Sequence, residues 1–292
     1  MKINYIIESY LSDKFHSLIN RLSDSVNEIR LRRDKPICFR GQAQEYFFND
    51  YMVTDRDIEY TLNLISDYSI YAYNSRLAQG YITIKGGCRI GVGGNVISEN
   101  NLIKGFSSIS SLNIRIPRQI AGCSKEIFNH ISKEFKSTLI ISPPACGKTT
   151  LLRDMVRELS NYKYNISIID ERSEIAFLHN GTAENDIGSR TDIIDGCNKK
   201  AGILMAIRGL APEIIAVDEI GKTEDINAIF SALCSGVKVL CTIHGDNITD
   251  IISRQDIKPL INHRVFDNYI FLEPVGRLKA VYNKELNCVW EK

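Results

Sequence analysis

Four short apolar runs in the second half of the chain constrain its fold more than any other feature. None of them alternates with polar residues, and each ends in polar or charged residues. Runs of this kind are typical of strands buried on both faces, as in a parallel sheet covered by helices. They are TLIIS (138–142), ISIID (166–170), EIIAVDE (213–219) and VKVLCTIH (237–244).

Helical segments separate these runs and complete an α/β pattern. The segment 147–159 places apolar residues at helical spacing, and so does the segment 223–234. We expect the second helix to begin with Thr223 as its cap and to stop at Gly236. The last 25 or so residues predict short antiparallel strands around turns. Together these segments indicate one domain over residues 119–292.

The preceding residues, 1–118, predict a small α+β domain. Apolar residues over 3–22 recur at helical spacing and indicate one bent helix or two short ones, and Thr54 is expected to cap another helix. Strands are expected on both sides of Pro36, around a hairpin turn at Gly86-Gly87, and over SLNIRIP. No residues in this part have catalytic spacing.

Composition limits the classes of partner. Lys plus Arg is 36 and Asp plus Glu is 35, so no global charge draws the chain onto nucleic acid or an anionic membrane. The 8 cysteines lack the CxxC spacing of zinc or redox sites and fit reduced cytosolic thiols. No apolar run reaches the ~18–20 residues of a membrane span, and the N-terminus does not predict a signal peptide. We expect a cytoplasmic protein with no membrane span. Peripheral association with a membrane is compatible with this expectation.

The residues after the first apolar run, SPPACGKT, nearly match the phosphate-binding loop GxxxxGK[ST]. In that loop, backbone N–H groups surround the β- and γ-phosphates, Lys148 is the cation on them, and Thr149 supplies a hydroxyl to Mg²⁺. Ser142 replaces the first glycine, at an expected cost on the order of 1 kcal/mol where φ must be positive. Taken alone, these residues also fit a proline-containing turn that caps a helix. The predicted ATP-binding residues are Ser142, Pro143, Pro144, Ala145, Cys146, Gly147, Lys148, Thr149 and Thr150.

Two adjacent carboxylates, Asp218 and Glu219, follow the third apolar run. In a parallel sheet they emerge at the carboxyl end of a buried strand, beside the loop. Asp218 can hold the hydration shell of the Mg²⁺ that Thr149 binds, and Glu219 can orient an attacking water. Alone, the pair also fits two solvated acids at a strand end. Together with the loop, it predicts nucleotide binding.

Two further strands end in polar clusters. The second run is followed by Glu171 and Arg172, and the fourth ends in Thr242 and His244. A single histidine is more often structural. A histidine at the end of the strand after Asp218 and Glu219, however, would lie near the γ-phosphate and could sense its loss. The candidate catalytic residues are therefore Glu219, Glu171 and His244.

These four strand-end motifs, in this order, resemble those of the secretion-type ATPases, the hexameric motors of type II and type IV secretion and of pilus retraction. The Walker A, Asp box, Walker B and His box of that family correspond to SPPACGKTT, IIDERSE, IRGLAPEIIAVDEIGKTED and CTIHG. A closer resemblance is to the stage III sporulation protein AA family of endospore formers. It is carried by NEIRLR and the following KP, the GYITI hairpin, SSLNIRI, IDERSEIA and IAVDEIG, and it runs from about residue 26 to the end.

The resemblance implies a RecA-like P-loop ATPase domain behind a small N-terminal domain, with ATP and Mg²⁺ as ligands. It also implies a ring homo-oligomer, a hexamer, and membrane channel proteins of the sporulation complex as partners, where mother cell and forespore are joined. The chain departs from the family at Ser142 and Ala145, where glycine is usual. Conversely, it has Asp218 where most secretion ATPases have glycine.

A neighbouring subunit in such a ring could close the site and add an arginine. For each arginine taken alone, a surface or ion-pairing role is the simpler explanation. Taken as a set, they favour at least one contact between subunits. The candidates are Arg115, Arg118, Arg172, Arg190 and Arg208.

Three functions fit these observations. The one we predict is an ATPase motor that energises a secretion-like channel. The second is a nucleotide-gated scaffold that binds ATP and hardly hydrolyses it, which Ser142 and Ala145 favour. The third is a nucleic-acid motor of the same fold, with a phosphate track of arginines, but it lacks a basic stripe interleaved with aromatic residues. The track would consist of Arg30, Arg32, Arg33 and Arg40.

Overall fold

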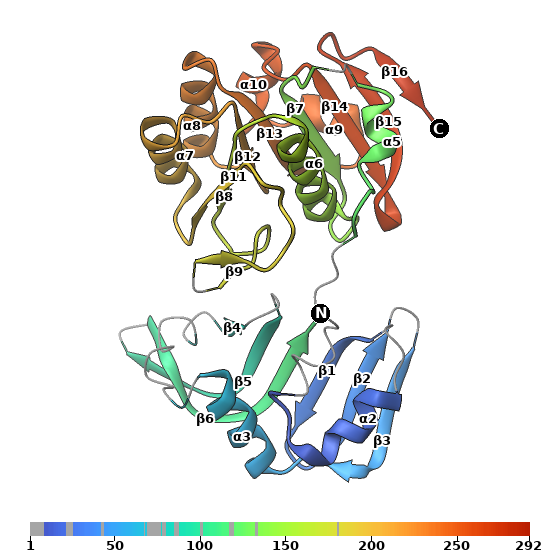
Figure 1. Ribbon diagram of the computed structural model, residues 1–292, viewed down its shortest axis with the longest axis vertical. Coiled ribbons are helices and arrows are strands. Elements are labelled where there is room, and N and C mark those ends of the chain that lie inside the picture. The colour runs from blue at the N-terminus through green and yellow to red at the C-terminus, as the bar shows by residue number, and fades with distance from the viewer. Residues whose placement is uncertain are drawn as a thin grey trace. The chain divides into compact units, whose positions relative to one another are not determined.

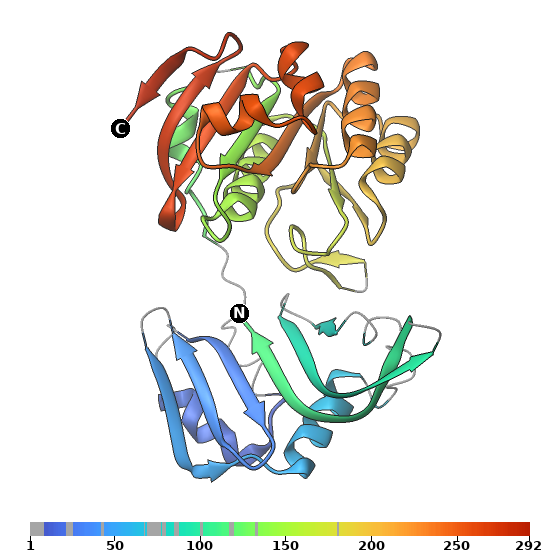
Figure 2. The same ribbon diagram turned by 180° about the vertical axis from the view of Figure 1, so that it is seen from behind.

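The computed structural model divides into two compact units, Met1–Arg118 and Gln119–Lys292, each described here by itself (Figures 1 and 2). The structure describes residues 9–21, 26–41, 44–66, 68, 77, 80–84, 88–99, 102–116, 120–131, 134–179 and 181–292. No helix in these ranges is both long and apolar enough to cross a membrane.

The first unit is built on a six-stranded antiparallel sheet in the order β3-β2-β1-β6-β5-β4. Apolar residues of one sheet face pack against the short helices, with Phe15, Ile29, Leu31 and Ile58 almost fully buried. The elements are η1 (Asp13–Phe15), α2 (His16–Arg21), β1 (Val26–Arg32), β2 (Pro36–Gly41), β3 (Glu45–Met52), α3 (Asp55–Ile65), β4 (Tyr81–Thr83), β5 (Arg89–Glu99) and β6 (Leu102–Arg115).

Several predictions for this unit are confirmed. Thr54 caps α3, and its side chain accepts the N–H of Asp57. Strands flank the turn before Pro36, and β4 and β5 form the predicted hairpin. The Gly86-Gly87 turn itself and residues 3–8 of the first predicted helix lie outside the described residues. The edge strand β3 was not predicted, because its apolar residues follow no clear alternation.

The second unit contains an eight-stranded sheet in the order β11-β8-β12-β13-β7-β14-β15-β16. The four predicted strands are its centre, and they pair in parallel. Parallel pairing extends to β11 and β14, whereas β15 and β16 are antiparallel. The strands are β7 (Thr138–Ser142), β8 (Ile166–Asp170), β11 (Thr191–Asp195), β12 (Ile214–Val217), β13 (Lys238–His244), β14 (Asn268–Glu273), β15 (Arg277–Asn283) and β16 (Cys288–Glu291).

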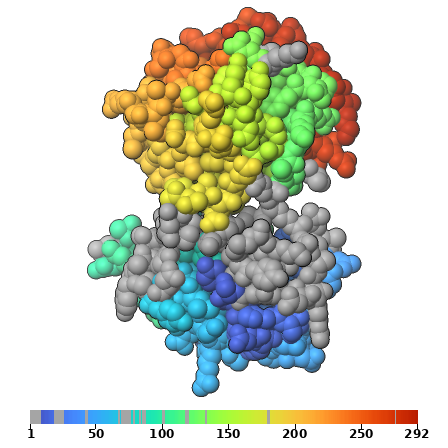
Figure 3. All heavy atoms as spheres, viewed as in Figure 1, coloured from blue at the N-terminus to red at the C-terminus, as the bar shows by residue number. Residues whose placement is uncertain are grey.

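Helices cover both faces of this sheet, as the uninterrupted apolar strands require. Figure 1 shows α5 and α6 on one face, and Figure 2 shows α9 and α10 on the other, which α7 and α8 also cover. Figure 3 shows the surface on the α5 and α6 side. The helices are α5 (Lys125–Phe128), α6 (Lys148–Tyr162), α7 (Lys199–Gly209), α8 (Thr223–Cys234), α9 (Ile248–Ser253) and α10 (Lys258–Asn262). The short elements are β9 (Leu178–His179), β10 (Thr182–Ala183) and η4 (Pro274–Gly276).

Two details of the predicted second unit were wrong. Thr223 is the first residue of α8 and not its cap; the cap is Lys222. The carboxylate of Asp225, in the first turn, accepts the backbone N–H of Lys222 at 3.2 Å, whereas a threonine cap would accept an N–H of the first turn with its own hydroxyl. In addition, β14 pairs in parallel with β7, so the antiparallel prediction for the last residues holds between β14, β15 and β16 only.

The segment before β7 is fastened to α6 by one buried carboxylate. Asp154 is 2% exposed and accepts hydrogen bonds from the N–H groups of Gly122 and Ser124 at 2.9 and 2.8 Å. The Ser124 hydroxyl and the Arg157 guanidinium also donate to it. Burial alone would raise the pKa of Asp154, but these donors outweigh burial and lower its pKa to about 2.

We expect Asp154→Asn to lower the free energy of unfolding by about 2 kcal/mol at pH 7, because a carboxylate with a depressed pKa stabilises the folded state. This contribution is complete above the ordinary aspartate pKa near 4 and is lost as the pH falls toward 2. Urea unfolding at pH 7 and at pH 3.5 or below would measure it. Glu158→Gln, at a neighbouring partly exposed partner of Arg157, should change stability by less than about 0.5 kcal/mol. Equal losses for the two variants would contradict the assignment.

Candidate functional site

The loop between β7 and α6 is shaped by two left-handed residues. Gly147 has φ 87° and caps α6, and Ala145 has φ 59°. A Cβ at Gly147 would lie 3.2 Å from the Cα of Gly276, so glycine is needed there for the close approach of η4. Ser142, by contrast, is the last residue of β7, is 1% exposed and has no positive φ. The expected conformational cost at Ser142 was therefore wrong, and the strained non-glycine residue of the loop is Ala145.

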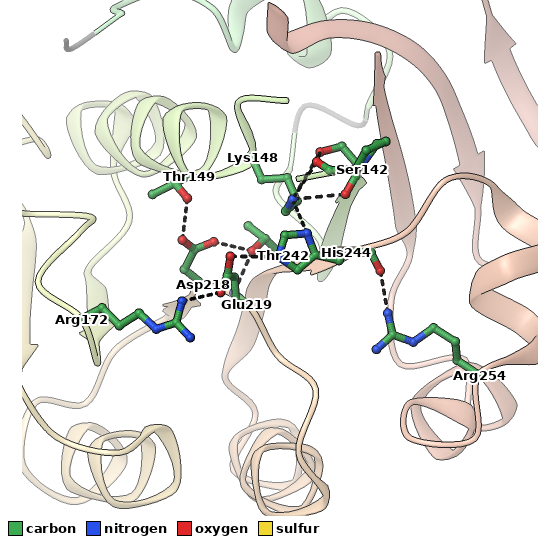
Figure 4. A network of polar contacts seen from close by, with 10 residues as sticks. Ser142, Lys148, Thr149, Arg172, Asp218, Glu219, Thr242, His244 and Arg254 are labelled. Carbon is green, nitrogen blue, oxygen red and sulfur yellow. Dashed lines mark hydrogen bonds and ion pairs between the residues drawn. The ribbon is translucent and has the colours of Figure 1, made fainter. Parts of the chain in front are cut away.

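Lys148, at the start of α6, points back onto the end of β7 (Figure 4). Its ammonium donates to the carbonyl oxygens of Ser142 and Pro143, both at 3.1 Å, and lies 3.0 Å from Nδ1 of His244. Burial lowers the pKa of Lys148, and the nearby carboxylates of Asp218 and Glu219 oppose that shift. The loop lysine is therefore surrounded by neutral acceptors.

These contacts determine the tautomer of His244. An ammonium group only donates hydrogen bonds, so Nδ1 of the imidazole accepts from Lys148. The ring proton then resides on Nε2, which lies 3.0 Å from Oε1 of Glu219 and donates to it. Arg254 donates to the backbone oxygen of His244 at 2.6 Å and so fixes the end of β13.

Asp218 and Glu219 follow directly on β12, as predicted, and lie beside the loop (Figure 4). Thr149 donates to Oδ2 of Asp218 at 2.6 Å, and the hydroxyl of Thr242 donates to Oδ1. Glu219 has φ 52°, a left-handed conformation that costs a non-glycine residue about 1–3 kcal/mol. Such strain persists only where surrounding contacts over-determine the backbone.

Both carboxylate oxygens of Glu219 are paired. His244 donates to Oε1, and Arg172 donates to Oε2 at 2.8 Å. The Arg172 side chain comes from the loop after β8 and is 60% exposed, so this side of the site is open to solvent. Lys148, His244, Glu219 and Arg172 thus form one continuous polar chain across three strand ends.

The acidic residues after β8 divide into two environments. Asp170 is 2% exposed and accepts the N–H groups of Glu174, Ile175 and Ala176 at 2.8–2.9 Å, which fixes the turn that follows. Burial nevertheless raises its pKa to about 6. Glu171 forms an ion pair with Lys199 at the start of α7. Burial acts to raise the pKa of Glu171, but the hydrogen bond and positive charge of Lys199, together with the charges of Lys222 and Arg172, lower the pKa overall.

A cavity of about 20 Å³ lies between the two acidic strand ends. This volume accommodates about one water molecule. Its lining includes Glu171, Arg172, Asp218, Glu219 and Lys199. In the described part of the chain, no three His, Cys, Asp or Glu side chains form a metal-ligand group. Beside this cavity, a divalent cation could be held by Thr149 and Asp218 together with ligand oxygens, which is the sparse protein ligation typical of Mg²⁺.

Of the candidate arginines in the second unit, Arg172 lies at this site, and Arg190 and Arg208 do not. Arg190 precedes β11, and its backbone oxygen accepts the N–H of Ile166 at the amino end of β8. Arg208, near the end of α7, also lies toward the amino ends of the strands, at the opposite edge of the sheet. Arg115 belongs to the first unit, and Arg118 lies outside the described residues. Lys199 and Arg254 were missed, because neither has a local sequence signal that marks its long-range partner.

Known proteins share sequence and fold with this chain. The family model described as "Sporulation stage III, protein AA" matches residues 4–289. The chain is 39% identical over 273 residues to Stage III sporulation protein AA of Bacillus subtilis (strain 168), covering 90% of this chain and 89% of that protein. It is 24% identical over 252 residues to Protein SEEDLING PLASTID DEVELOPMENT 1 of Arabidopsis thaliana, covering 84% of this chain and 33% of that protein.

Two solved structures share the fold. One is the pilus retraction motor PilT with bound ADP, with a TM-score of 0.60, 16% identity, and coverage of 96% of this chain and 81% of that chain. The other is the Yersinia pseudotuberculosis ATPase DotB, with a TM-score of 0.62, 13% identity, and coverage of 90% and 76%. The predicted fold, a RecA-like P-loop α/β core preceded in sequence by a small α+β part, is thereby confirmed.

Proposed function

The chain belongs to the family of sporulation stage III protein AA, and from this premise we propose that it is an ATP-hydrolysing ring motor of a sporulation-associated, secretion-like channel. One observation carries the proposal: Lys148, Thr149, Asp218 and Glu219 converge at one edge of the parallel sheet. The family supports a cytoplasmic place, peripheral at a membrane complex, with channel proteins as partners.

ATP would bind at the loop through its phosphates. The N-terminus of α6 presents unpaired N–H groups and the positive end of a 15-residue helix dipole. Lys148 would exchange its neutral acceptors for phosphate oxygens, because an ammonium group binds an anionic oxygen more strongly than a neutral carbonyl oxygen. Gly147 leaves its side of the loop without a side chain. The residues that would frame the phosphates are Ser142 to Thr150, as proposed from the sequence.

Thr149 and Asp218 would hold the Mg²⁺ that accompanies ATP. Their oxygens already face each other at 2.6 Å, so the hydroxyl can turn its lone pair to a cation that Asp218 holds directly or through water. When bound, the cation neutralises charge on the β- and γ-phosphates. Glu219 would orient the attacking water as general base, in or beside the small cavity between the acidic strand ends. His244 links Lys148 to Glu219, so it would lose its hydrogen bond from Lys148 when Lys148 moves to a phosphate.

Lys148→Ala should weaken binding of a fluorescent ATP analogue on the order of 100-fold or more, because two charge-assisted hydrogen bonds are lost. Binding is measured by titration with fluorescence anisotropy. Lys163→Ala provides the matched control, since Lys163 lies at the other end of the same helix. Wild-type affinity in Lys148→Ala would disprove the site.

Glu219→Gln should retain nucleotide binding and reduce turnover by about 10²–10⁴-fold, because the amide keeps the size of the side chain and loses its basicity. Phosphate release measures turnover. Glu171→Gln should have a much smaller effect, since Lys199 already neutralises Glu171. Equal losses would mean that Glu171 shares the role of the base, and unchanged turnover in Glu219→Gln would contradict the assignment.

Ring assembly is part of the proposal because the site is incomplete on its exposed side. The exposed Arg172 side chain marks the open side, and a neighbouring subunit could exclude water there. Arg190 and Arg208 lie at the opposite edge of the sheet, so either could serve only the site of another copy. Arg115 and Arg118 remain candidates from the first unit. By resemblance to the secretion-type ATPases, the ring would be a hexamer.

Turnover per subunit should therefore rise with protein concentration, and Lys148→Ala subunits mixed into wild-type protein should depress activity more than dilution does. Sedimentation with ATP present, together with turnover across a concentration series, tests this. A monomer with constant turnover per subunit would contradict the ring. That result would instead support a monomeric protein that acts as a nucleotide-dependent switch.

A nucleotide-gated scaffold is the second candidate, because both carboxylate oxygens of Glu219 are occupied and Ala145 is strained. Tight ATP binding with turnover as slow as that of Glu219→Gln would favour it. The nucleic-acid motor has less support. Ion pairs of Arg30 with Glu28, Arg33 with Asp55 and Arg40 with Glu45 fit a solvated strand face better than a phosphate track.

A further inference from the structure

Thr242 makes three contacts to three consecutive residues of the neighbouring strand end. Its hydroxyl donates to Oδ1 of Asp218 and accepts the N–H of Glu219 at 2.8 Å (Figure 4). Its backbone oxygen accepts the N–H of Ile220 at 2.9 Å. Thr242 is 0% exposed, so these bonds do not compete with solvent.

The first consequence concerns the orientation of the Asp218 carboxylate. Its two oxygens have different donors: Thr242 for Oδ1 and Thr149 for Oδ2. The proposed cation site needs Thr149 to turn its hydroxyl proton away from Asp218 and a lone pair toward the cation, which leaves Oδ2 free. The Thr242 bond to Oδ1 persists through that change. It therefore determines which oxygen of Asp218 faces the cation.

The second consequence concerns the backbone of Glu219. Ladder pairing between β12 and β13 ends at Val217 and Cys241, and Glu219 then takes a left-handed conformation. Its N–H points to the Thr242 hydroxyl and not to a backbone acceptor. A buried N–H that loses its acceptor costs about 1–3 kcal/mol. The hydroxyl thus helps to hold a strained residue whose side chain would position the water.

We infer that Thr242 is a positioning residue that couples the orientation of the cation-binding carboxylate to that of the water-positioning glutamate. The inference rests on the proposed function, since it assigns these roles to Asp218 and Glu219. A single hydroxyl suits this coupling because it donates one hydrogen bond and accepts another at the same time. Valine has nearly the same shape and can do neither.

The test compares Thr242→Val, Thr242→Ser and the control Thr138→Val with wild-type protein. Thr138 is also a fully buried threonine on a neighbouring parallel strand, but its hydroxyl donates to Lys136 at the opposite edge of the sheet. Binding of a fluorescent ATP analogue is measured first in EDTA and then as Mg²⁺ is added. The Mg²⁺ requirement is the Mg²⁺ concentration at which half of the change in binding has occurred. The kinetic constants kcat and KM for ATP are measured as well. Thermal unfolding shows whether each variant is folded.

For Thr242→Val we expect a 10–100-fold higher Mg²⁺ requirement and a 10–100-fold lower kcat, the range typical for loss of a residue that orients a metal ligand. Binding in EDTA should stay within about twofold of wild type. Thr242→Ser should restore both quantities to within about threefold, and Thr138→Val should change neither.

Two results would overturn the inference. One is a wild-type Mg²⁺ requirement in folded Thr242→Val. The other is a Thr242→Ser variant as impaired as Thr242→Val, which would assign the effect to the methyl group and to packing. If wild-type protein binds the nucleotide with Mg²⁺ but does not hydrolyse it, the hydrolytic part of the proposed function fails. The Mg²⁺ titration then still decides whether Thr242 orients Asp218.

Discussion

Parallel pairing of β8, β12, β13 and β7 is the constraint on which the candidate site depends. The register places Val217 beside Cys241 and His244 beside Ser142, so the chain leaves all these strands at one edge. A shift of one residue in β13 would turn Thr242 and His244 toward the opposite face of the sheet. The apolar residues of the same strands fill the cores on both faces. Burial of these apolar side chains therefore fixes the strand register, and the register brings the polar side chains at the strand ends into contact.

Much of this arrangement could be predicted because it depends on local patterns. Uninterrupted apolar runs marked the central strands, and polar residues at their ends marked one edge of the sheet. The parallel partner of β14 could not be predicted, because its strand pattern does not distinguish a parallel from an antiparallel neighbour. The ion pair of Glu171 with Lys199 joins residues that no periodicity connects. Such ion pairs form only when distant elements pack together, so the local sequence around each residue does not predict them.

Backbone strain is the part of the site that residue types predicted least well. A serine in place of the first loop glycine suggested a cost at Ser142, yet that residue continues β7 in extended conformation. The left-handed residues are Ala145 and Glu219. Neither residue type favours that conformation, so only the surrounding contacts explain it. At Glu219 one such contact is the Thr242 hydroxyl, which connects a strained backbone to the carboxylate that precedes it.

The polar chain from Lys148 to Arg172 gives the site two possible arrangements of the same residues. In the structure, Lys148 donates to His244, and His244 donates to Glu219. A phosphate at the loop would draw Lys148 away and leave Nδ1 of His244 without its donor, because charge-assisted bonds to phosphate are stronger than bonds to an imidazole. The imidazole would then be free to rotate, and rotation would alter its bond to Glu219. A motor requires that the state of the nucleotide change contacts on other strands. In the proposed motor, the imidazole between the loop lysine and Glu219, which follows β12, would transmit such a change.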